Sequence, residues 1–268
     1  HFGQAQGTPF TEPPLSSDVN WSASTEEAEA ILAGEYITES EVPQCQALLD
    51  ACKAAAELDT IPANLTMEDF AGKIKSWKES TSTSPSGRHL GRYKALFARS
   101  KYCRKTEEFE YSTFLRKQQA IAAYALSIIN YCIRHGYILE RWKTIVNIMI
   151  FKDPGDFKIH RLRVIHIYEA DFNLLLAVKW RQLLKVANET GLINEGQFGG
   201  RPGCEAQFLT LLEELKYDIS YLTRRTLFNF DNDAMSCYDR IIITLASLIS
   251  RKYGQHRQVV AVHAGTLE

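Results

Sequence analysis

One segment, residues 226–240, constrains the fold and the chemistry of this chain more than any other. It reads Thr-Leu-Phe-Asn-Phe-Asp-Asn-Asp-Ala-Met-Ser-Cys-Tyr-Asp-Arg, a short run rich in Leu and Phe that ends in two aspartates. Such a run predicts a buried strand that delivers carboxylates to its exposed end, ahead of a new helix. Because Mg²⁺ prefers one or two carboxylate oxygens together with substrate phosphates, this arrangement favours phosphate or nucleotide chemistry.

The composition is that of a globular protein. The chain has 268 residues, of which 45% are hydrophobic and 24% charged, enough for one large domain or two small ones. Its six cysteines form no Cys-x-x-Cys pair, which argues against a zinc site or a disulfide framework and predicts reduced thiols in an intracellular protein. No apolar run is long enough to cross a membrane.

Charge is distributed unevenly along the chain. Residues 1–70 contain thirteen acidic residues and one basic residue, whereas residues 71–268 contain 30 basic and 19 acidic residues, a net charge of +11. This excess predicts a polyanionic partner that is bound through its phosphates. The alternative is that the two parts neutralise each other across a shared surface. The most basic stretch, residues 72–105, has ten lysines and arginines and one acid, Glu79.

Periodicity and capping signals predict a mainly helical chain. Residues 1–25 are rich in Pro, Ser and Thr and lack apolar periodicity, so we expect disorder there. A capping box, Thr66-Met-Glu-Asp69, predicts the start of one helix, and Gly136 predicts the end of another. The helices predicted in this way cover residues 39–57, 66–79, 107–135, 171–188, 205–222 and 239–253.

A β-hairpin is predicted between the third and fourth of these helices. Thr144 to Phe151 and Arg161 to Ile167 have strand character, and the turn chemistry of Lys152-Asp-Pro-Gly-Asp156 joins them. Lys152 and Arg163 flank the turn and could clamp a triphosphate, the lysine as a point charge and the arginine as a bidentate donor. A solvated basic hairpin is the alternative.

The aspartates of the opening segment could serve a metal pair. Asp231 and Asp233 are two residues apart and share a face in a regular strand, while Asp239 begins the next helix. Two-metal displacement places the ions about 4 Å apart and needs bridging carboxylates. The alternative is that an aspartate at this position caps the helix.

The order of these motifs resembles that of the reverse transcriptases of non-LTR retrotransposons, over about residues 66–268. Asp233-Ala-Met-Ser-Cys-Tyr-Asp239 is similar to the first palm motif of that family, Asp-x-x-x-Ala-Phe-Asp. Gln197-Phe-Gly-Gly-Arg-Pro-Gly203 is similar to the block Gln-Phe-Gly-x-Arg-x-Gly that precedes the palm. The predicted hairpin resembles the fingers strands, and Ser84 to Tyr93 resembles a block near the start of the fingers.

The resemblance implies a role for each matching residue. Asp233 would bind catalytic Mg²⁺, two ions in the complete enzyme, with Asp231 as a second candidate ligand. Tyr238 would pack beneath the sugar and exclude a ribonucleotide, with Ala234 beside it in the nucleotide site. Lys152 and Arg163 would contact the triphosphate. The implied template-binding residues are Gln197, Arg201, Arg88 and Lys94.

The resemblance also implies the architecture. We expect an α+β fold, with helix-rich right-hand polymerase fingers, a β-hairpin and the beginning of an incomplete palm. The expected segments are a disordered lead-in at 1–25, an acidic helical segment at 26–65, the fingers and their connection to the palm at 66–225, and the start of the palm at 226–268.

One departure from the family concerns the other palm motifs. The family has a second palm motif and a third with paired aspartates, yet no Asp-Asp pair occurs in this chain. We therefore expect the pair beyond Glu268, in the rest of a longer polyprotein. One palm carboxylate cannot position two metal ions, so we expect this fragment alone to be inactive as a polymerase.

The leading hypothesis is thus a fragment of an RNA-directed DNA polymerase whose partners are an RNA template, a DNA primer and deoxynucleoside triphosphates, with no membrane. An alternative is a non-catalytic nucleic-acid-binding module that uses residues 72–105. A further alternative is a phosphatase-like enzyme with Asp231 as nucleophile, although only 35 residues follow Asp233.

Overall fold

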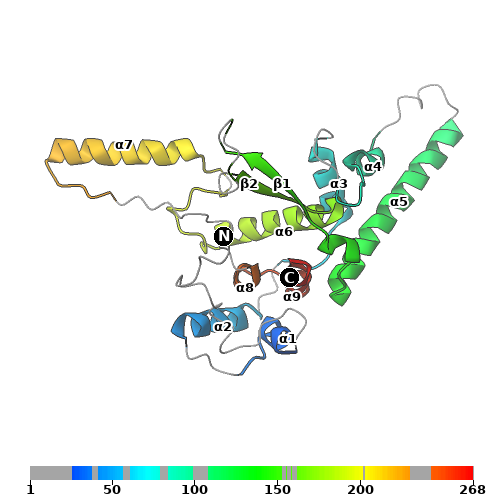
Figure 1. The fold of residues 1–268 in the computed structure, drawn as a ribbon, viewed down its shortest axis with the longest axis horizontal. Helices are drawn as coiled ribbons and strands as arrows, with labels where there is room; N and C mark the ends of the chain where they lie inside the picture. Colours follow the sequence, from blue (N-terminus) through cyan, green and yellow to red (C-terminus); the bar gives the residue numbers. More distant parts are fainter. Residues whose placement is uncertain are drawn as a thin grey trace.

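The computed structural model describes residues 26–37, 42–56, 61–78, 84–98, 108–152, 155, 158, 162–201, 203–229 and 243–267. Within these ranges the fold is α+β with helices dominant, and the described strands form one two-stranded antiparallel sheet (Figure 1). The elements are α1 (Glu26–Ala33), α2 (Pro43–Ala56), α3 (Met67–Ser76), α4 (Leu90–Ala95), α5 (Glu108–His135), the 3-10 helix η3 (Glu140–Lys143), β1 (Val146–Phe151), β2 (Leu162–Ile167), α6 (Ala170–Glu189), α7 (Ala206–Thr223), α8 (Ile243–Lys252) and α9 (Arg257–Leu267).

The predicted helices and the predicted hairpin are confirmed to within a few residues at their described ends. The capping box of α3 forms in both directions, because the Asp69 backbone N–H donates to Thr66 Oγ1 at 3.0 Å and the Thr66 N–H donates to Asp69 Oδ2 at 3.2 Å. Helix α5 ends where Gly136 turns left-handed, at φ 60°. Helix α7 ends in the same way at Arg224, φ 49°, without a glycine.

Several elements carry signals too weak to predict. Helices α1 and α4 have eight and six residues, too few for a clear periodicity. Helix α9 has the sequence RQVVAVHAGTL, which is rich in Val and apolar on most sides. Such a run fits a buried strand as well as a buried helix, and only packing decides between them.

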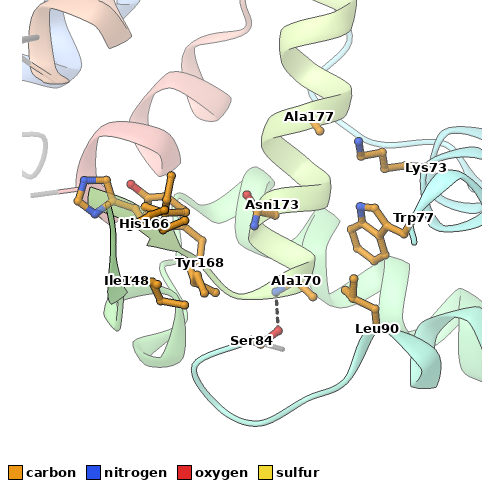
Figure 2. Close-up of a pocket in the computed structure, with 13 residues that line it drawn as sticks. Lys73, Trp77, Ser84, Leu90, Ile148, His166, Tyr168, Ala170, Asn173 and Ala177 are labelled. Atoms are coloured by element: carbon orange, nitrogen blue, oxygen red, sulfur yellow. Dashed lines mark hydrogen bonds between the residues drawn. The ribbon is translucent and has the colours of Figure 1, made fainter. Parts of the chain in front are cut away.

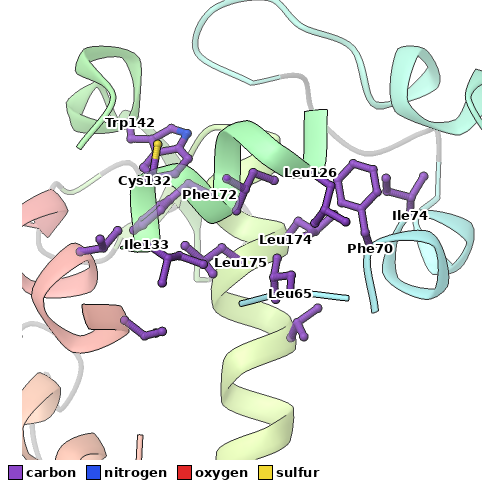
Figure 3. Close-up of a cluster of buried hydrophobic side chains, with 14 of the residues drawn as sticks. Leu65, Phe70, Ile74, Leu126, Cys132, Ile133, Trp142, Phe172, Leu174 and Leu175 are labelled. Carbon is purple, nitrogen blue, oxygen red and sulfur yellow. The ribbon is translucent and has the colours of Figure 1, made fainter. Parts of the chain in front are cut away.

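The main hydrophobic core surrounds α6, which runs through the middle of the molecule (Figure 1). Figure 3 shows Phe70 and Ile74 of α3, Ile133 of α5 and Phe172 of α6 converging there, together with Trp142 of η3. All five side chains are fully buried, and the rings of Trp142 and Phe172 lie 5.4 Å apart. Each buried side chain of this size contributes about 1.5–3 kcal/mol.

A second core joins the two ends of the described chain. Ile31 of α1, Cys52 of α2, Leu248 of α8 and Val260 of α9 pack in it. The buried Arg251 side chain donates from Nε to the Leu32 carbonyl at 3.1 Å and ties α8 to α1. Burial raises the pKa of the Cys52 thiol to about 11. The N-terminal helices α1 and α2 therefore pack against α8 and α9. The predicted segment boundaries at 65 and 225 stay predictions.

The prediction of a buried strand at the start of the aspartate segment is wrong for its described part. Residues 225–229 have no regular secondary structure, and Phe228 is 91% exposed. A strand needs a neighbour to pair its N–H and C=O groups, and no third strand exists in the described ranges. The preceding helix α7 stands away from the body in Figure 1, with Phe208 and Leu211 about half exposed, each at 52%.

Among the helices in the described ranges, none combines the length and the apolar character that crossing a bilayer requires.

Candidate functional site

The hairpin presents two distinct faces, which its register defines. Strands β1 and β2 pair antiparallel from Val146 opposite Ile167 to Phe151 opposite Leu162. Side chains alternate along a strand, and directly opposite residues share a face. One face, here called the inner face, therefore consists of Val146, Ile148, Ile150, Arg163, Ile165 and Ile167.

A cavity of about 430 Å³ lies beneath the inner face (Figure 2). The hairpin forms one side with Ile148, Ile150, Ile165 and Ile167. Trp77, the residue that follows the last turn of α3, lies across the cavity from Ile148 in Figure 2. A volume in this range is typical of small-molecule and cofactor sites.

The cavity is electropositive on one side. Among its described lining residues Lys73 of α3 is the only lysine or arginine, and no Asp or Glu is present. Burial lowers the pKa of Lys73, and the positive charge of Arg181 on α6 lowers it further. Asn173 and Ser84 add neutral polar groups to the lining. An anionic group in the cavity would therefore meet a cation without competition from a lining carboxylate.

A cluster of buried charges lies beside the cavity. Arg141 of η3 donates from Nη1 to Asp171 Oδ1 at 2.6 Å and to Glu169 Oε2 at 3.2 Å, and its Nη2 bonds to Asp171 Oδ2. The indole of Trp142 donates to Asp171 Oδ1 at 2.9 Å. Burial lowers the pKa of Arg141, but the hydrogen bonds and negative charge of Asp171 outweigh burial and raise it overall. Arg141, Glu169 and Asp171 are called the charge cluster below.

The charge cluster also anchors the loop that precedes α4. Ser86 donates to the Glu169 carboxylate from its backbone N–H at 2.8 Å and from its hydroxyl at 3.0 Å. One step further along α6, the Ala170 N–H donates to Ser84 Oγ at 2.9 Å, the dashed line in Figure 2. Ser84 and Ala170 line the cavity. These bonds join residues 83 and 86 positions apart in sequence. They hold the loop at Ser84 and the start of α6 together as one wall of the cavity.

The structure places the two predicted triphosphate contacts on the hairpin. Arg163 belongs to the inner face, directly opposite Ile150. Lys152 follows the last residue of β1 and is two positions beyond Ile150, so continued alternation puts it on the same face. Both side chains are exposed. The hairpin thus carries a cationic tip above an apolar cavity.

The predicted template residues fall into two separate groups. Arg88 is exposed in the anchored loop, where its side chain bonds to Tyr93, and Lys94 is half-buried on α4, the helix whose Leu90 lines the cavity. Gln197 and Arg201 lie beyond the other end of α6.

Gln197 and Arg201 organise their own loop. Arg201 Nε donates to Asn188 Oδ1 at 2.6 Å, and Gln197 Nε2 donates to the Gly199 carbonyl at 3.1 Å. Asn188 is fifteen residues from Asn173, the cavity residue on α6, which corresponds to roughly 22 Å along the helix. The structure therefore does not bring this pair to the cavity, and its template role stays a prediction.

The predicted metal and sugar-binding residues, Asp231, Asp233, Ala234 and Tyr238, lie outside the described residues. In the part of the chain that is described, no group of three or more His, Cys, Asp or Glu side chains is placed to hold a metal ion.

Several residues of the site escaped the sequence prediction. Lys73 and Trp77 are four apart, a spacing that puts two residues on one face of the predicted helix 66–79, so this spacing was an available signal. In the structure α3 ends at Ser76 and Trp77 caps it. The charge cluster had none, because Arg141 is 30 residues from Asp171 and only the fold brings them together.

A larger hollow, of about 750 Å³, lies elsewhere, between α1, the end of α5, η3 and α9. It is lined by Glu29, His135 and Lys143 among others and contains none of the predicted site residues. The lining of the hairpin cavity also contains none of them, but the hairpin that forms one of its sides carries Lys152 and Arg163 at its tip, so the hairpin cavity is the candidate site.

Comparisons of the chain with protein-family models, with curated proteins and with solved structures found no match.

Proposed function

We propose that this chain is the fingers and the first part of the palm of an RNA-directed DNA polymerase of the non-LTR retrotransposon type. The observation that carries the proposal is the hairpin register, which puts Arg163 and, by continued alternation, Lys152 on one face near the hairpin tip. This is the arrangement that the sequence resemblance requires of two residues that hold one triphosphate. A hairpin whose register was shifted by one residue would put Arg163 on the opposite face from the cavity.

The inner face divides into two parts with different chemistry. At the tip, Lys152 and Arg163 bind phosphate oxygens, the arginine through paired N–H donors. Toward the base, Ile148 and Ile165 present apolar surface, and Trp77 faces them from α3. Apolar and aromatic side chains support stacked bases, while cations hold the backbone of the strand. The template therefore enters along the apolar part, and the incoming nucleotide binds at the tip.

The palm contributes the metal site in this proposal. Asp233, with Asp231 beside it in sequence, would hold Mg²⁺ together with carboxylates of palm motifs that this chain does not contain. The bound ion supplies electrostatic stabilisation of charge on the transferred phosphoryl group. Tyr238 and Ala234 would form the floor of the sugar site. Support for these roles comes from the sequence alone.

A second candidate is a nucleic-acid-binding module without catalysis. The exposure of Arg88 and Arg92 around α4 favours it. In that case binding depends on the basic stretch 72–105 and not on the hairpin tip.

Binding measurements distinguish the two candidates. An RNA template annealed to a DNA primer is titrated with the chain, with and without the complementary deoxynucleoside triphosphate, by fluorescence anisotropy. The polymerase proposal expects Arg163→Gln to weaken nucleotide-dependent binding about tenfold, as for the loss of one charge-assisted contact. Lys185→Gln is the matched control, because Lys185 is exposed on α6 and its Nζ lies 3.9 Å from the exposed carboxylate of Glu189, one turn along the helix. Equal nucleotide-dependent affinities for the two variants refute the polymerase proposal.

A separate assay tests catalysis. A polypeptide that joins this chain to the two missing palm motifs should extend the primer on RNA in the presence of Mg²⁺. In that polypeptide, Asp233→Asn should abolish extension and leave template binding unchanged. Full extension by the variant contradicts the assignment of Asp233.

A further inference from the structure

The hairpin cavity has the properties of a small-molecule site in its own right. Its volume of about 430 Å³ is bordered by parts of α3, α4, α6, the loop at Ser84 and the hairpin, and it opens to solvent on one side. Ile148, Ile150 and Ile165 remain 39%, 49% and 44% exposed, because they face this space and the solvent beyond it. A ligand that covered them would gain the free energy of apolar burial.

The walls opposite the hairpin are held in place before any ligand binds. The Ser84–Ala170 hydrogen bond and the two Ser86–Glu169 hydrogen bonds fix the loop against the start of α6. The ring of Trp77 packs edge-on against Tyr93, with centroids 6.2 Å apart, which restrains the indole. Pre-organised walls lower the ordering cost of binding.

The lining specifies the chemistry of the ligand. Trp77 and Tyr168 offer aromatic surface for a planar ring. Lys73 offers one positive charge, with no lining carboxylate to compete for it and with Asn173 as a neutral hydrogen-bonding group. One cation suits a monoanion, and the apolar walls suit the ring that carries it.

We propose that the cavity binds free planar aromatic monoanions, with the ring between the inner face and Trp77 and the anionic group on Lys73. This inference stands on the cavity alone and does not require the chain to be a polymerase fragment. A bound ligand joins the hairpin to α3 and α6, so it also slows local opening of the hairpin.

The test is a titration of the chain with naphthoate, followed in a two-dimensional N–H correlation spectrum. The indole signal of Trp77 is identified by its loss in Trp77→Phe. It should shift in a saturable manner on addition of naphthoate, and hydrogen exchange of the β1 and β2 amides should slow. Saturating shifts at another tryptophan, such as the exposed Trp180 of α6, with none at Trp77 overturn the proposal, because the ligand would then bind outside the cavity.

Two matched comparisons test the role of charge. Lys73→Gln should weaken naphthoate binding about tenfold, the effect of one charge-assisted contact, and Lys75→Gln, an exposed lysine of α3 outside the cavity lining, should leave it unchanged. In the unaltered chain, naphthyl methanol, which has the ring without the charge, should bind about as weakly as naphthoate binds to Lys73→Gln. Equal affinities of the two lysine variants, or of the two ligands, would sink the proposal.

Competition between naphthoate and the RNA–DNA primer–template separates this inference from the proposed function. Displacement of bound naphthoate by the primer–template supports both, because template bases and the small anion then share the cavity. Binding of naphthoate at Trp77 without displacement supports the small-molecule site and counts against the template path proposed above.

Discussion

Removal of Arg141 should destabilise this protein far more than removal of a surface cation. Glu169 has 0% and Asp171 4% of its surface exposed, and Arg141 forms ion pairs with both. In Arg141→Leu an apolar side chain replaces the guanidinium, and the two buried carboxylates lose their shared cation. Breaking a buried ion pair by deleting one partner costs about 3–5 kcal/mol, because the remaining charge stays desolvated. Loss of the guanidinium above the Trp142 ring, 5.9 Å from its centroid, adds about 0.5–1 kcal/mol.

Urea unfolding followed by far-ultraviolet circular dichroism measures this cost. A loss of this size is a large part of the roughly 5–15 kcal/mol by which domains are usually stable. The matched control is Lys143→Leu on the same 3-10 helix, whose ammonium lies 3.8 Å from an exposed Glu140 carboxylate. Exposed pairs of this kind contribute about 0–1 kcal/mol. If the two variants unfold with free energies within about 1 kcal/mol of each other, the charge cluster does not have the structural role derived from its burial.

The remaining predictions concern pH and local structure. Burial lowers the pKa of Lys179 from 10.5 to about 8, so the unfolded chain holds its proton more tightly. The contribution of Lys179 to stability is therefore fully present above pH 10.5 and lost as pH falls through 8. Urea unfolding at a series of pH values should show the free energy of unfolding rising between pH 8 and 10.5, and Lys179→Met should remove this rise. Burial lowers the pKa of His263 from 6.5 to about 4, so its contribution is present above pH 6.5 and lost as pH falls through 4. The loss amounts to at most about 3 kcal/mol, and an unchanged pH profile in His263→Gln would contradict it. Finally, Thr66→Ala should cost about 1 kcal/mol in thermal or urea unfolding, since it removes the capping box of α3. Thr190→Ala, at the C-terminal end of α6, should cost less, and equal costs would show that the cap of α3 contributes little.

The sequence predicts most long elements because their signals are local. Helix α5 has 28 residues of helical pattern and a terminal glycine, and the hairpin has two strand-like runs with a Pro-Gly turn between them. The hairpin prediction also placed Lys152 and Arg163 near the tip, but their common face follows only from the strand register, which the structure supplies.

What the sequence does not predict depends on partners distant in the chain. The charge cluster unites Arg141 with Glu169 and Asp171, and the cavity unites α3 with the hairpin and α6. At residues 226–229 the sequence predicts an element that does not form. The apolar run is strand-like, but a strand needs a pairing partner, and the described residues provide none. A local pattern cannot report whether that partner exists.

Photo-crosslinking tests the proposed role of the hairpin most directly. An RNA template carrying thiouridine at and next to the templating position is annealed to a DNA primer, bound to the chain and irradiated, and the crosslinked peptides are mapped by mass spectrometry. The polymerase proposal predicts crosslinks to the hairpin, residues 146–167, and to the peptide that contains Trp77, with loss of the hairpin crosslinks in a Lys152→Gln, Arg163→Gln double variant. Crosslinks confined to other parts of the basic stretch 72–105, or hairpin crosslinks that the double variant leaves unchanged, would contradict it.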